Sequence, residues 1–295
     1  MESLSRRRAL ALGGGAALGT AGILAGAVGA GAKGSAARGP EAKAGRAGAA
    51  GGWQRLVVVT ANIGRDHRDA REGAIRGVRH AVTVDGALAQ PLVGWQEIGE
   101  GDDDGKEAKF IRKHFQSSYS NLFVGDKTAG QVPISVPRTF NVVDHRVTFA
   151  HGGKADVSPH RVITEAVLEL AADPQVKFVF ANTHYVAGAW NGKDDPAETW
   201  RHQMWQRHFR KHRDDVLGHW HAKGYPVLWT GDVNRSHMPL LVPGHEKRVF
   251  SSGIDQIGWL PGTNGTEIRL NRTTTVPMHV DNHDARVAIM QVRRA

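Results

Sequence analysis

From Trp53 onward, apolar runs of strand length alternate with longer segments of helical pattern. Such alternation is typical of α/β proteins, in which helices cover the sheets. A long helix is expected from about residue 196 to residue 222, because Asp195-Pro196-Ala197-Glu198 supplies an N-cap, a proline at the first helical position and a glutamate at the third. No long polar tract divides this part, so residues 53–295 are predicted to form one domain. The predicted strands are residues 56–60, 91–95, 140–149, 161–170, 176–181, 226–230 and 286–292.

Four of these strands end in polar side chains. In open α/β sheets, ligand sites form at the carboxyl ends of the strands. Any one such residue is commonly a turn or capping group, but four strand ends with complementary chemistry favour a site. The four ends are Ala61-Asn62, Gln96-Glu97, Asn182-Thr183-His184 and Gly231-Asp232-Val233-Asn234.

The oxygen-bearing residues at these ends suit a hard cation and a phosphate group. Glu97 and Asp232 are carboxylates of the kind that bind Mg²⁺ or Ca²⁺. The amides of Asn62 and Asn234 can hold a phosphate oxygen without repelling the carboxylates.

The histidines add proton transfer. His184 and His283 are of the residue type that can move protons near neutral pH, and Asp255 lies at a strand edge from which it could orient an imidazole. Carboxylates for metal, amides for phosphate and an Asp–His pair for water together indicate metal-assisted phosphoester hydrolysis.

These residues occur in ordered motifs. The chain resembles the endonuclease/exonuclease/phosphatase superfamily, which has the deoxyribonuclease-I-like fold, over nearly all of residues 56–292. The resemblance implies a four-layered α/β sandwich, with two mixed sheets packed face to face and helices outside. It also implies a phosphodiesterase or phosphatase that depends on Mg²⁺, with Mn²⁺ or Ca²⁺ as alternatives. The motifs are Thr60-Ala61-Asn62, Trp95-Gln96-Glu97, Asn182-Thr183-His184, Gly231-Asp232-Val233-Asn234, Ile254-Asp255 and Asn282-His283.

The resemblance assigns the metal and the phosphate to particular residues. Glu97 is implied as the main metal ligand, with Asn62 beside it where metal and phosphate meet. His184 would bind or protonate the phosphate, and Asn234 would hold one of its oxygens. Arg161, at the start of a strand, is a candidate phosphate clamp or else a solvated arginine.

The remaining implied roles concern the attacking water. Asp232 would position it, and His283, oriented by Asp255, would act as a base or stabilise the transition state. One position departs from the family pattern, which has Asp directly before the last His. Here that residue is Asn282, preceded by Asp281, and an amide without charge predicts weaker metal binding.

The amino-terminal residues read as an export signal. Ser5-Arg6-Arg7-Arg8 precedes 24 uncharged residues that end in the small-residue sequence Ala30-Gly31-Ala32. Paired arginines before a Gly/Ala-rich run resemble a twin-arginine signal, so residues 1–32 are predicted to be removed on secretion. A retained membrane anchor is the alternative. Residues 33–52 are predicted to be a flexible linker, and the mature chain a secreted monomer without stable membrane association.

The amino-acid composition excludes some classes of site and bears on the substrate class. The chain has no cysteine, which excludes disulfides, thiol nucleophiles and cysteine-ligated metals. Much of the net charge of +9 lies before residue 53, so charge alone is weak evidence for nucleic-acid binding. The leading hypothesis is a nuclease, with nucleic acid as the phosphate-ester substrate. The alternatives are a phosphodiesterase or phosphatase for phospholipid or small phosphate esters, and a weakened binding protein.

Other motifs are assigned to structure. His208 and His212 have the i, i+4 spacing of zinc ligands but no neighbouring glutamate, and we expect them on a solvated helix face. Trp200, Trp205 and Trp220 are expected to be packing residues of that helix. Asp102-Asp103-Asp104-Gly105 is predicted to be a solvated loop before a helix from about Lys106.

Overall fold

The computed structural model describes residues 52–64, 70–80, 82–84, 86–99, 106–124, 129–155, 157–190, 199–279 and 283–295. The predicted signal and linker therefore lie outside the described residues, except for Gly52 at the linker's end. Asp281, Asn282 and the loop at residues 102–105 lie outside them as well. Within the described part, no helix combines the length and the apolar character needed to cross a membrane.

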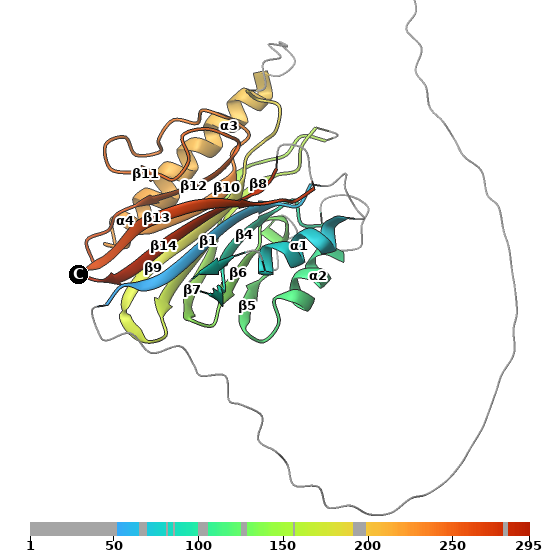
Figure 1. Cartoon of the computed structure of the whole chain (residues 1–295). Helices are drawn as coiled ribbons and strands as arrows, with labels where there is room; N and C mark the ends of the chain where they lie inside the picture. The colour runs from blue at the N-terminus through green and yellow to red at the C-terminus, as the bar shows by residue number, and fades with distance from the viewer. Residues whose placement is uncertain are drawn as a thin grey trace, which may run out of the picture. The chain divides into compact units, whose positions relative to one another are not determined.

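Two six-stranded mixed sheets form the centre of the fold (Figure 1). The first has the order β13-β14-β1-β4-β6-β5, and the second has the order β11-β12-β10-β9-β8-β7. The strands of the first sheet are β13 (Thr266–Val276), β14 (Ala285–Arg294), β1 (Gln54–Asn62), β4 (Leu92–Gln96), β6 (Ile134–Pro137) and β5 (Tyr119–Leu122). Those of the second are β11 (Lys247–Arg248), β12 (Asp255–Leu260), β10 (Val227–Asp232), β9 (Asp173–His184), β8 (Arg161–Leu170) and β7 (Phe140–His151). A hairpin of β2 (Thr83–Val84) and β3 (Ala87–Leu88) stands apart.

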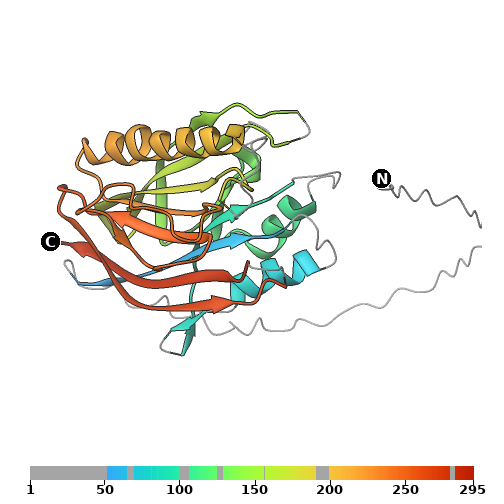
Figure 2. The same cartoon turned by 90° about the horizontal axis from the view of Figure 1, so that it is seen from above.

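Helices cover the outer face of each sheet. Helices α1 (Arg71–His80) and α2 (Lys106–His114) pack on the first sheet, and α3 (Thr199–Lys211) packs on the second (Figure 2). Helix α3 continues through a π-helical stretch, His212–Gly218, into the short α4 (His219–His221). The expected helix is thus present from Thr199 to His221, while residues 196–198 lie outside the described part.

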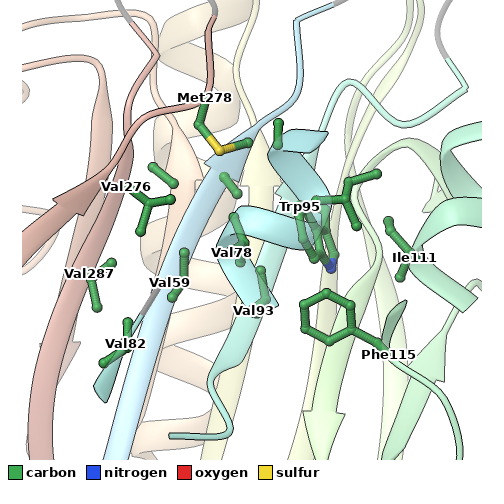
Figure 3. Close-up of a cluster of buried hydrophobic side chains, with 14 of the residues drawn as sticks. Val59, Val78, Val82, Val93, Trp95, Ile111, Phe115, Val276, Met278 and Val287 are labelled. Atoms are coloured by element: carbon green, nitrogen blue, oxygen red, sulfur yellow. The ribbon is translucent and has the colours of Figure 1, made fainter. Parts of the chain in front are cut away.

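The alternation of side chains along each strand builds the layers. On β1, Leu56 and Val58 face the second sheet and pack in the core between the sheets. Val57 and Val59 point the other way, toward α1 and α2, where Val78, Ile111 and Phe115 are among the buried side chains (Figure 3). On the far side, Val179 and Ala181 of β9 pack against Trp205 and Trp220 of the helix. Each central strand is buried on both faces, which gives the predicted four-layered sandwich.

The tryptophans of the long helix are packing residues, as predicted. Trp205 and Trp220 are buried, and Trp200 is partly buried against the same core. All seven predicted strands are present, most of them longer than predicted, and a helix begins at Lys106 as expected.

Candidate active site

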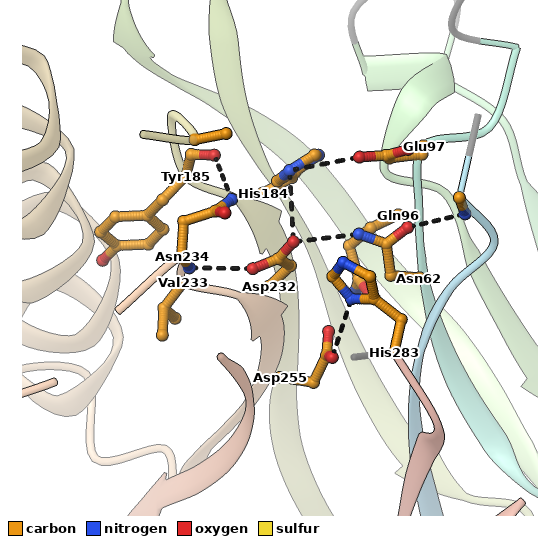
Figure 4. A network of polar contacts seen from close by, with 12 residues as sticks. Asn62, Gln96, Glu97, His184, Tyr185, Asp232, Val233, Asn234, Asp255 and His283 are labelled. Atoms are coloured by element: carbon orange, nitrogen blue, oxygen red, sulfur yellow. Dashed lines mark hydrogen bonds and ion pairs between the residues drawn. The ribbon is translucent and has the colours of Figure 1, made fainter. Parts of the chain in front are cut away.

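The polar strand ends meet at one end of the sandwich (Figure 4). Strands β1 and β4 are parallel, with Asn62 opposite Gln96, the residue before Glu97. Strands β9 and β10 are also parallel, with His184 opposite Asp232. Asp232 in turn lies opposite Asp255 at the start of the antiparallel β12. We call the six side chains Asn62, Glu97, His184, Asp232, Asp255 and His283 the active-site cluster.

Asp232 is the centre of this cluster. Its Oδ2 accepts a hydrogen bond of 2.9 Å from Nδ2 of Asn62, which belongs to the other sheet. Its Oδ1 accepts a bond of 2.8 Å from the backbone N–H of Asn234. The side chain is almost fully buried. Donors on both oxygens fix the orientation of the carboxylate.

His184 faces two carboxylates. Its Nε2 lies 3.5 Å from Oδ2 of Asp232 and 3.9 Å from Oε1 of Glu97. Its Nδ1 lies 3.1 Å from a guanidinium nitrogen of Arg161, which can only donate. His184 therefore carries its proton on Nε2, the atom that faces the carboxylates. This is the nitrogen that can donate to a phosphate oxygen.

Arg161 is not solvated. It is 3% exposed, and it fixes the tautomer of His184 by donating to the ring from behind. The solvated alternative is therefore wrong, because strand β8 places this arginine beside β9, inside the protein. Its Nη1 contacts the ring of His184.

Glu97 has an unusual backbone conformation. Its φ is 60°, in the left-handed region that residues with a side chain seldom adopt. Such conformations cost about 1–3 kcal/mol and cluster at functional sites. The residue comes directly after β4, and this turn directs its carboxylate toward His184 (Figure 4).

Asn234 also has a positive φ, 48°, which asparagine tolerates more readily. Its side-chain nitrogen donates to the backbone oxygen of Tyr185 at 3.1 Å. The side-chain oxygen of Asn62 accepts from the backbone N–H of Gly64 at 2.9 Å. Both predicted phosphate-binding amides are thus held at the site by bonds within the protein.

His283 and Asp255 form a hydrogen-bonded pair. Nδ1 of His283 lies 3.0 Å from Oδ2 of Asp255. Burial alone would lower the pKa of His283, but the bond to Asp255 and the charges of Asp232 and Glu97 outweigh it and raise the pKa to about 9. Burial raises the pKa of Asp255 to about 6, against the opposing effect of His283. Near neutral pH the pair is an imidazolium with a carboxylate, which suits stabilisation of a negative transition state better than general-base catalysis.

The cluster fits a divalent cation. A carboxylate oxygen of Asp232, one of Asp255 and a ring nitrogen of His283 lie within 4.8 Å of one another, and the two carboxylates are the ligands available while His283 is protonated. Oδ1 of Asp255 is buried and has no hydrogen-bond partner among the described residues. Carboxylate oxygens are hard ligands that suit Mg²⁺, Mn²⁺ or Ca²⁺. This group differs from the predicted ligands Glu97, Asn62 and Asn282, of which Asn282 lies outside the described residues.

A polar seam between the two sheets lies beneath the cluster, and its role was not predicted. Nδ2 of Asn182 donates to the backbone oxygen of Trp95 at 2.7 Å. Oδ1 of Asn182 accepts from Gln96 at 2.6 Å and from Thr230 at 3.0 Å. Gly94 leaves the room for these contacts, because a Cβ there would lie 2.0 Å from Oγ1 of Thr230. Asn182 and Gln96 were visible as polar residues at strand ends, but the bridge between sheets depends on tertiary packing.

The prediction of a solvated face at His208 and His212 is wrong, because both are fully buried. His208 stacks on Tyr185 with ring centroids 3.8 Å apart, and its Nε2 lies 2.8 Å from Oγ1 of Thr183. The hydroxyl of Tyr185 lies 3.0 Å from Nδ1 of His212. The two histidines anchor the helix to the end of β9, next to His184.

Comparison with known proteins identifies the fold. No protein-family model matches the sequence, and no curated protein sequence matches it. An endonuclease/exonuclease/phosphatase family protein from Bacteroides thetaiotaomicron has a similar structure, with a TM-score of 0.56 and 13% identity over 83% of this chain and 97% of that chain. The chain has the endonuclease/exonuclease/phosphatase fold. This confirms the fold that the ordered motifs predicted.

Two further structures with this fold are described in different terms, one as a sugar phosphatase and the other with a DNA product. A mannosyl-6-phosphatase from Bacteroides thetaiotaomicron matches with a TM-score of 0.55 and 14% identity, over 80% of this chain and 99% of that chain. TDP2 from D. rerio, in complex with a single-stranded DNA product, matches with a TM-score of 0.53 and 12% identity, over 80% of this chain and 99% of that chain.

Proposed function

We propose that the chain is a divalent-metal-dependent phosphoesterase that hydrolyses phosphodiester bonds in nucleic acid. The observation that carries the proposal is the active-site cluster. It joins three carboxylates and two histidines at the strand ends of both sheets. A purely structural cluster has no need to bring three carboxylates together or to hold Glu97 at a φ of 60°.

Each side chain has a chemical task in this proposal. His184 donates from Nε2 to a phosphate oxygen, with Arg161 holding its tautomer. Asp232 accepts a hydrogen bond from the attacking water and aligns it. The imidazolium of His283, held by Asp255, stabilises the negative charge that develops on the phosphate oxygens.

Glu97, Asp232 and Asp255 are the carboxylates that would hold the cation, and Asn62 would lie beside it. A bound divalent ion supplies Lewis-acid stabilisation of the phosphoryl oxygens and offsets the mutual repulsion of the carboxylates. Asn62 already links the two sheets through its bond to Asp232, so it keeps the carboxylate in place whether or not the ion is bound.

Nucleic acid is the proposed substrate class on two grounds. A neighbour of the same fold, TDP2 from D. rerio, is described in complex with a single-stranded DNA product. Residues 53–295, which carry the active-site cluster, have 31 basic and 27 acidic residues, and this net charge of +4 is compatible with a polyanionic substrate. Export is part of the proposal and rests on residues 1–32, whose arginine-led, uncharged sequence resembles a twin-arginine signal.

A phosphatase acting on small phosphate esters is the second candidate. Another neighbour of the same fold is described as a mannosyl-6-phosphatase. A monoester carries a terminal phosphate and a nuclease substrate an internal one, so a substrate screen separates the two.

The test measures hydrolysis of plasmid DNA, RNA, sphingomyelin and p-nitrophenyl phosphate esters, with Mg²⁺ and with chelator. We expect Mg²⁺-dependent cleavage of nucleic acid, and a loss of about 100-fold or more in Glu97→Gln, which keeps the shape but removes the charge. Glu267→Gln is the matched control, because Glu267 is a half-exposed glutamate on β13 that pairs with Arg293 and not with the active-site cluster. Equal activity in excess chelator, or full activity of Glu97→Gln, would show that the cluster is not the catalytic centre.

A further inference from the structure

Arg235 follows Asn234 directly, and its guanidinium packs against two tryptophans. Its guanidinium carbon lies 4.1 Å from the ring centroid of Trp190 and 5.2 Å from that of Trp205. The two indoles meet edge to face, with centroids 5.6 Å apart. A guanidinium over an indole face is a favourable cation–π contact that also restricts the arginine to few conformations.

The tryptophans are themselves fixed. Trp205 is buried, and its indole N–H donates to the backbone oxygen of Val233 at 2.8 Å, two residues before Arg235. Trp190 is 38% exposed and stacks on His202, with centroids 4.8 Å apart. The aromatic support of Arg235 therefore joins the protein core to its surface.

Arg235 lacks an acidic partner among the described residues. Two other arginines of limited exposure are neutralised: Arg146 is paired with Glu165 at 2.7 Å, and Arg248 with Glu246 at 3.0 Å. No carboxylate of the described residues forms such a pair with Arg235, although burial lowers its pKa. Burying part of a cation costs free energy, which an anionic partner recovers.

The position of Arg235 points to the substrate as that partner. It lies in the segment that leaves the carboxyl end of β10, just beyond Asp232. Trp190 lies in the segment that leaves β9, just beyond His184. Because β9 and β10 are parallel neighbours, both segments leave the same edge of the sheet, where the active-site cluster lies.

We propose that Arg235, supported by Trp190 and Trp205, is a second anion site that binds the phosphate next to the one being cleaved. The inference rests on the proposed function and narrows the substrate to chains with more than one phosphate. A planar guanidinium presents paired donors to phosphate, and a cation–π contact with an indole does not use up these N–H donors, so they can bind a ligand.

The kinetic test compares two thymidine substrates and uses the full chain. The trinucleoside diphosphate keeps a neighbouring phosphate whichever bond is cut, and the dinucleoside monophosphate has none. We expect Arg235→Gln to lower kcat/KM for the two-phosphate substrate about 10- to 100-fold more than for the one-phosphate substrate. Equal losses on both substrates, or no loss on either, would overturn the proposal.

A binding measurement tests the second anion site independently of catalysis. Anisotropy of labelled oligothymidine in chelator, titrated over salt concentration, gives the slope of log K against log salt. Loss of one phosphate contact in Arg235→Gln should reduce the magnitude of this slope by about 0.7. Arg235→Lys should keep the slope but weaken binding, because an ammonium lacks the planar face and the paired donors of a guanidinium. Trp190→Leu should weaken binding as well.

Arg269→Gln is the matched control. Arg269 also lies over an indole, 4.0 Å from the centroid of Trp53, but it lies on β13 beside Gln291. Gln291 pairs with Arg55 near the start of β1, at the opposite end of that strand from Asn62. An equal effect of Arg269→Gln would mean non-specific attraction and would overturn the proposal.

The two proposals fail differently. A chain that cleaves phosphodiesters but shows no substrate difference in Arg235→Gln keeps the proposed function and loses the second anion site. If the wild type cleaves no phosphodiester but Arg235→Gln reduces the salt dependence of oligothymidine binding as expected, the anion site stands and the proposed nuclease function fails. Wild-type protein that does not bind oligothymidine would overturn the anion site.

Discussion

Acid should destabilise this protein through its buried histidines, and His212 allows the effect to be worked out. The side chain is fully buried, lies 3.0 Å from the hydroxyl of Tyr185 and packs edge to face on Trp229 with centroids 5.0 Å apart. Burial lowers its pKa from 6.5 to about 3. Below about pH 6.5 the unfolded chain therefore binds a proton at His212 that the folded chain does not bind. The part of the free energy of unfolding that His212 contributes above that pH is lost as the pH falls. At about 1.4 kcal/mol per pH unit, moving from about pH 7 to about pH 5 should cost about 2 kcal/mol at this residue alone.

The assay is urea unfolding at both pH values, followed by tryptophan fluorescence, for the wild type and for His212→Phe. The variant leaves the hydroxyl of Tyr185 unpartnered, so it should be less stable at neutral pH by about 1–3 kcal/mol. At about pH 5 the difference in the free energy of unfolding should shrink by about 2 kcal/mol or change sign, because the variant has no histidine at this position that gains a proton on unfolding. His145→Gln, at an exposed position of β7, should differ from the wild type by the same amount at both pH values. Parallel pH profiles for wild type and His212→Phe would refute the reasoning.

Three further predictions concern the polar seam at Gly94, the residue Asn282 and the export signal. Gly94→Ala should lower the free energy of unfolding by about 1–3 kcal/mol or more in urea, because the added Cβ would lie 2.0 Å from Thr230 and 2.4 Å from Asn182; unchanged stability would contradict this packing. Asn282→Asp should lower the Mg²⁺ concentration needed for half-maximal activity, because a carboxylate is a stronger hard ligand than an amide. An unchanged Mg²⁺ titration would mean that residue 282 does not contact the metal. Replacing Arg6 and Arg7 by Lys should block secretion if the signal is of the twin-arginine type, and unchanged secretion would remove that assignment.

The central strands could be predicted from the sequence because both of their faces are buried. Residues 56–60 and 226–230 are almost continuously apolar, which is the pattern of strands buried on both faces. Strand β13 was missed because most of its residues, including Arg272, Thr273 and Thr274, are exposed and polar. Strand β6 was missed because its four residues, Ile134–Pro137, carry too short an apolar pattern.

Much of the candidate site could be predicted because strand ends carry its side chains in motif order. The structure brings together Asn62, Glu97, His184 and Asp232, and it joins His283 to Asp255 as expected. The burial of His208 could not be predicted, because its helix is rich in charged residues and its contact is with Thr183 of another element. The environment of Arg235 could not be predicted either, since its aromatic contacts are Trp190 and Trp205, both distant in sequence.

The most direct test of the central claim, that the active-site cluster hydrolyses phosphodiesters, is the single-turnover rate of DNA cleavage with Mg²⁺ in Asp232→Asn. Asp232 joins both sheets through Asn62 and faces His184, so loss of its charge removes the group that aligns the attacking water. The account predicts a rate about 100- to 10,000-fold below that of the wild type, with the folded structure retained. Asp144→Asn, at an exposed position of β7, should cleave at the wild-type rate. Cleavage by folded Asp232→Asn at the rate of the wild type would contradict the account.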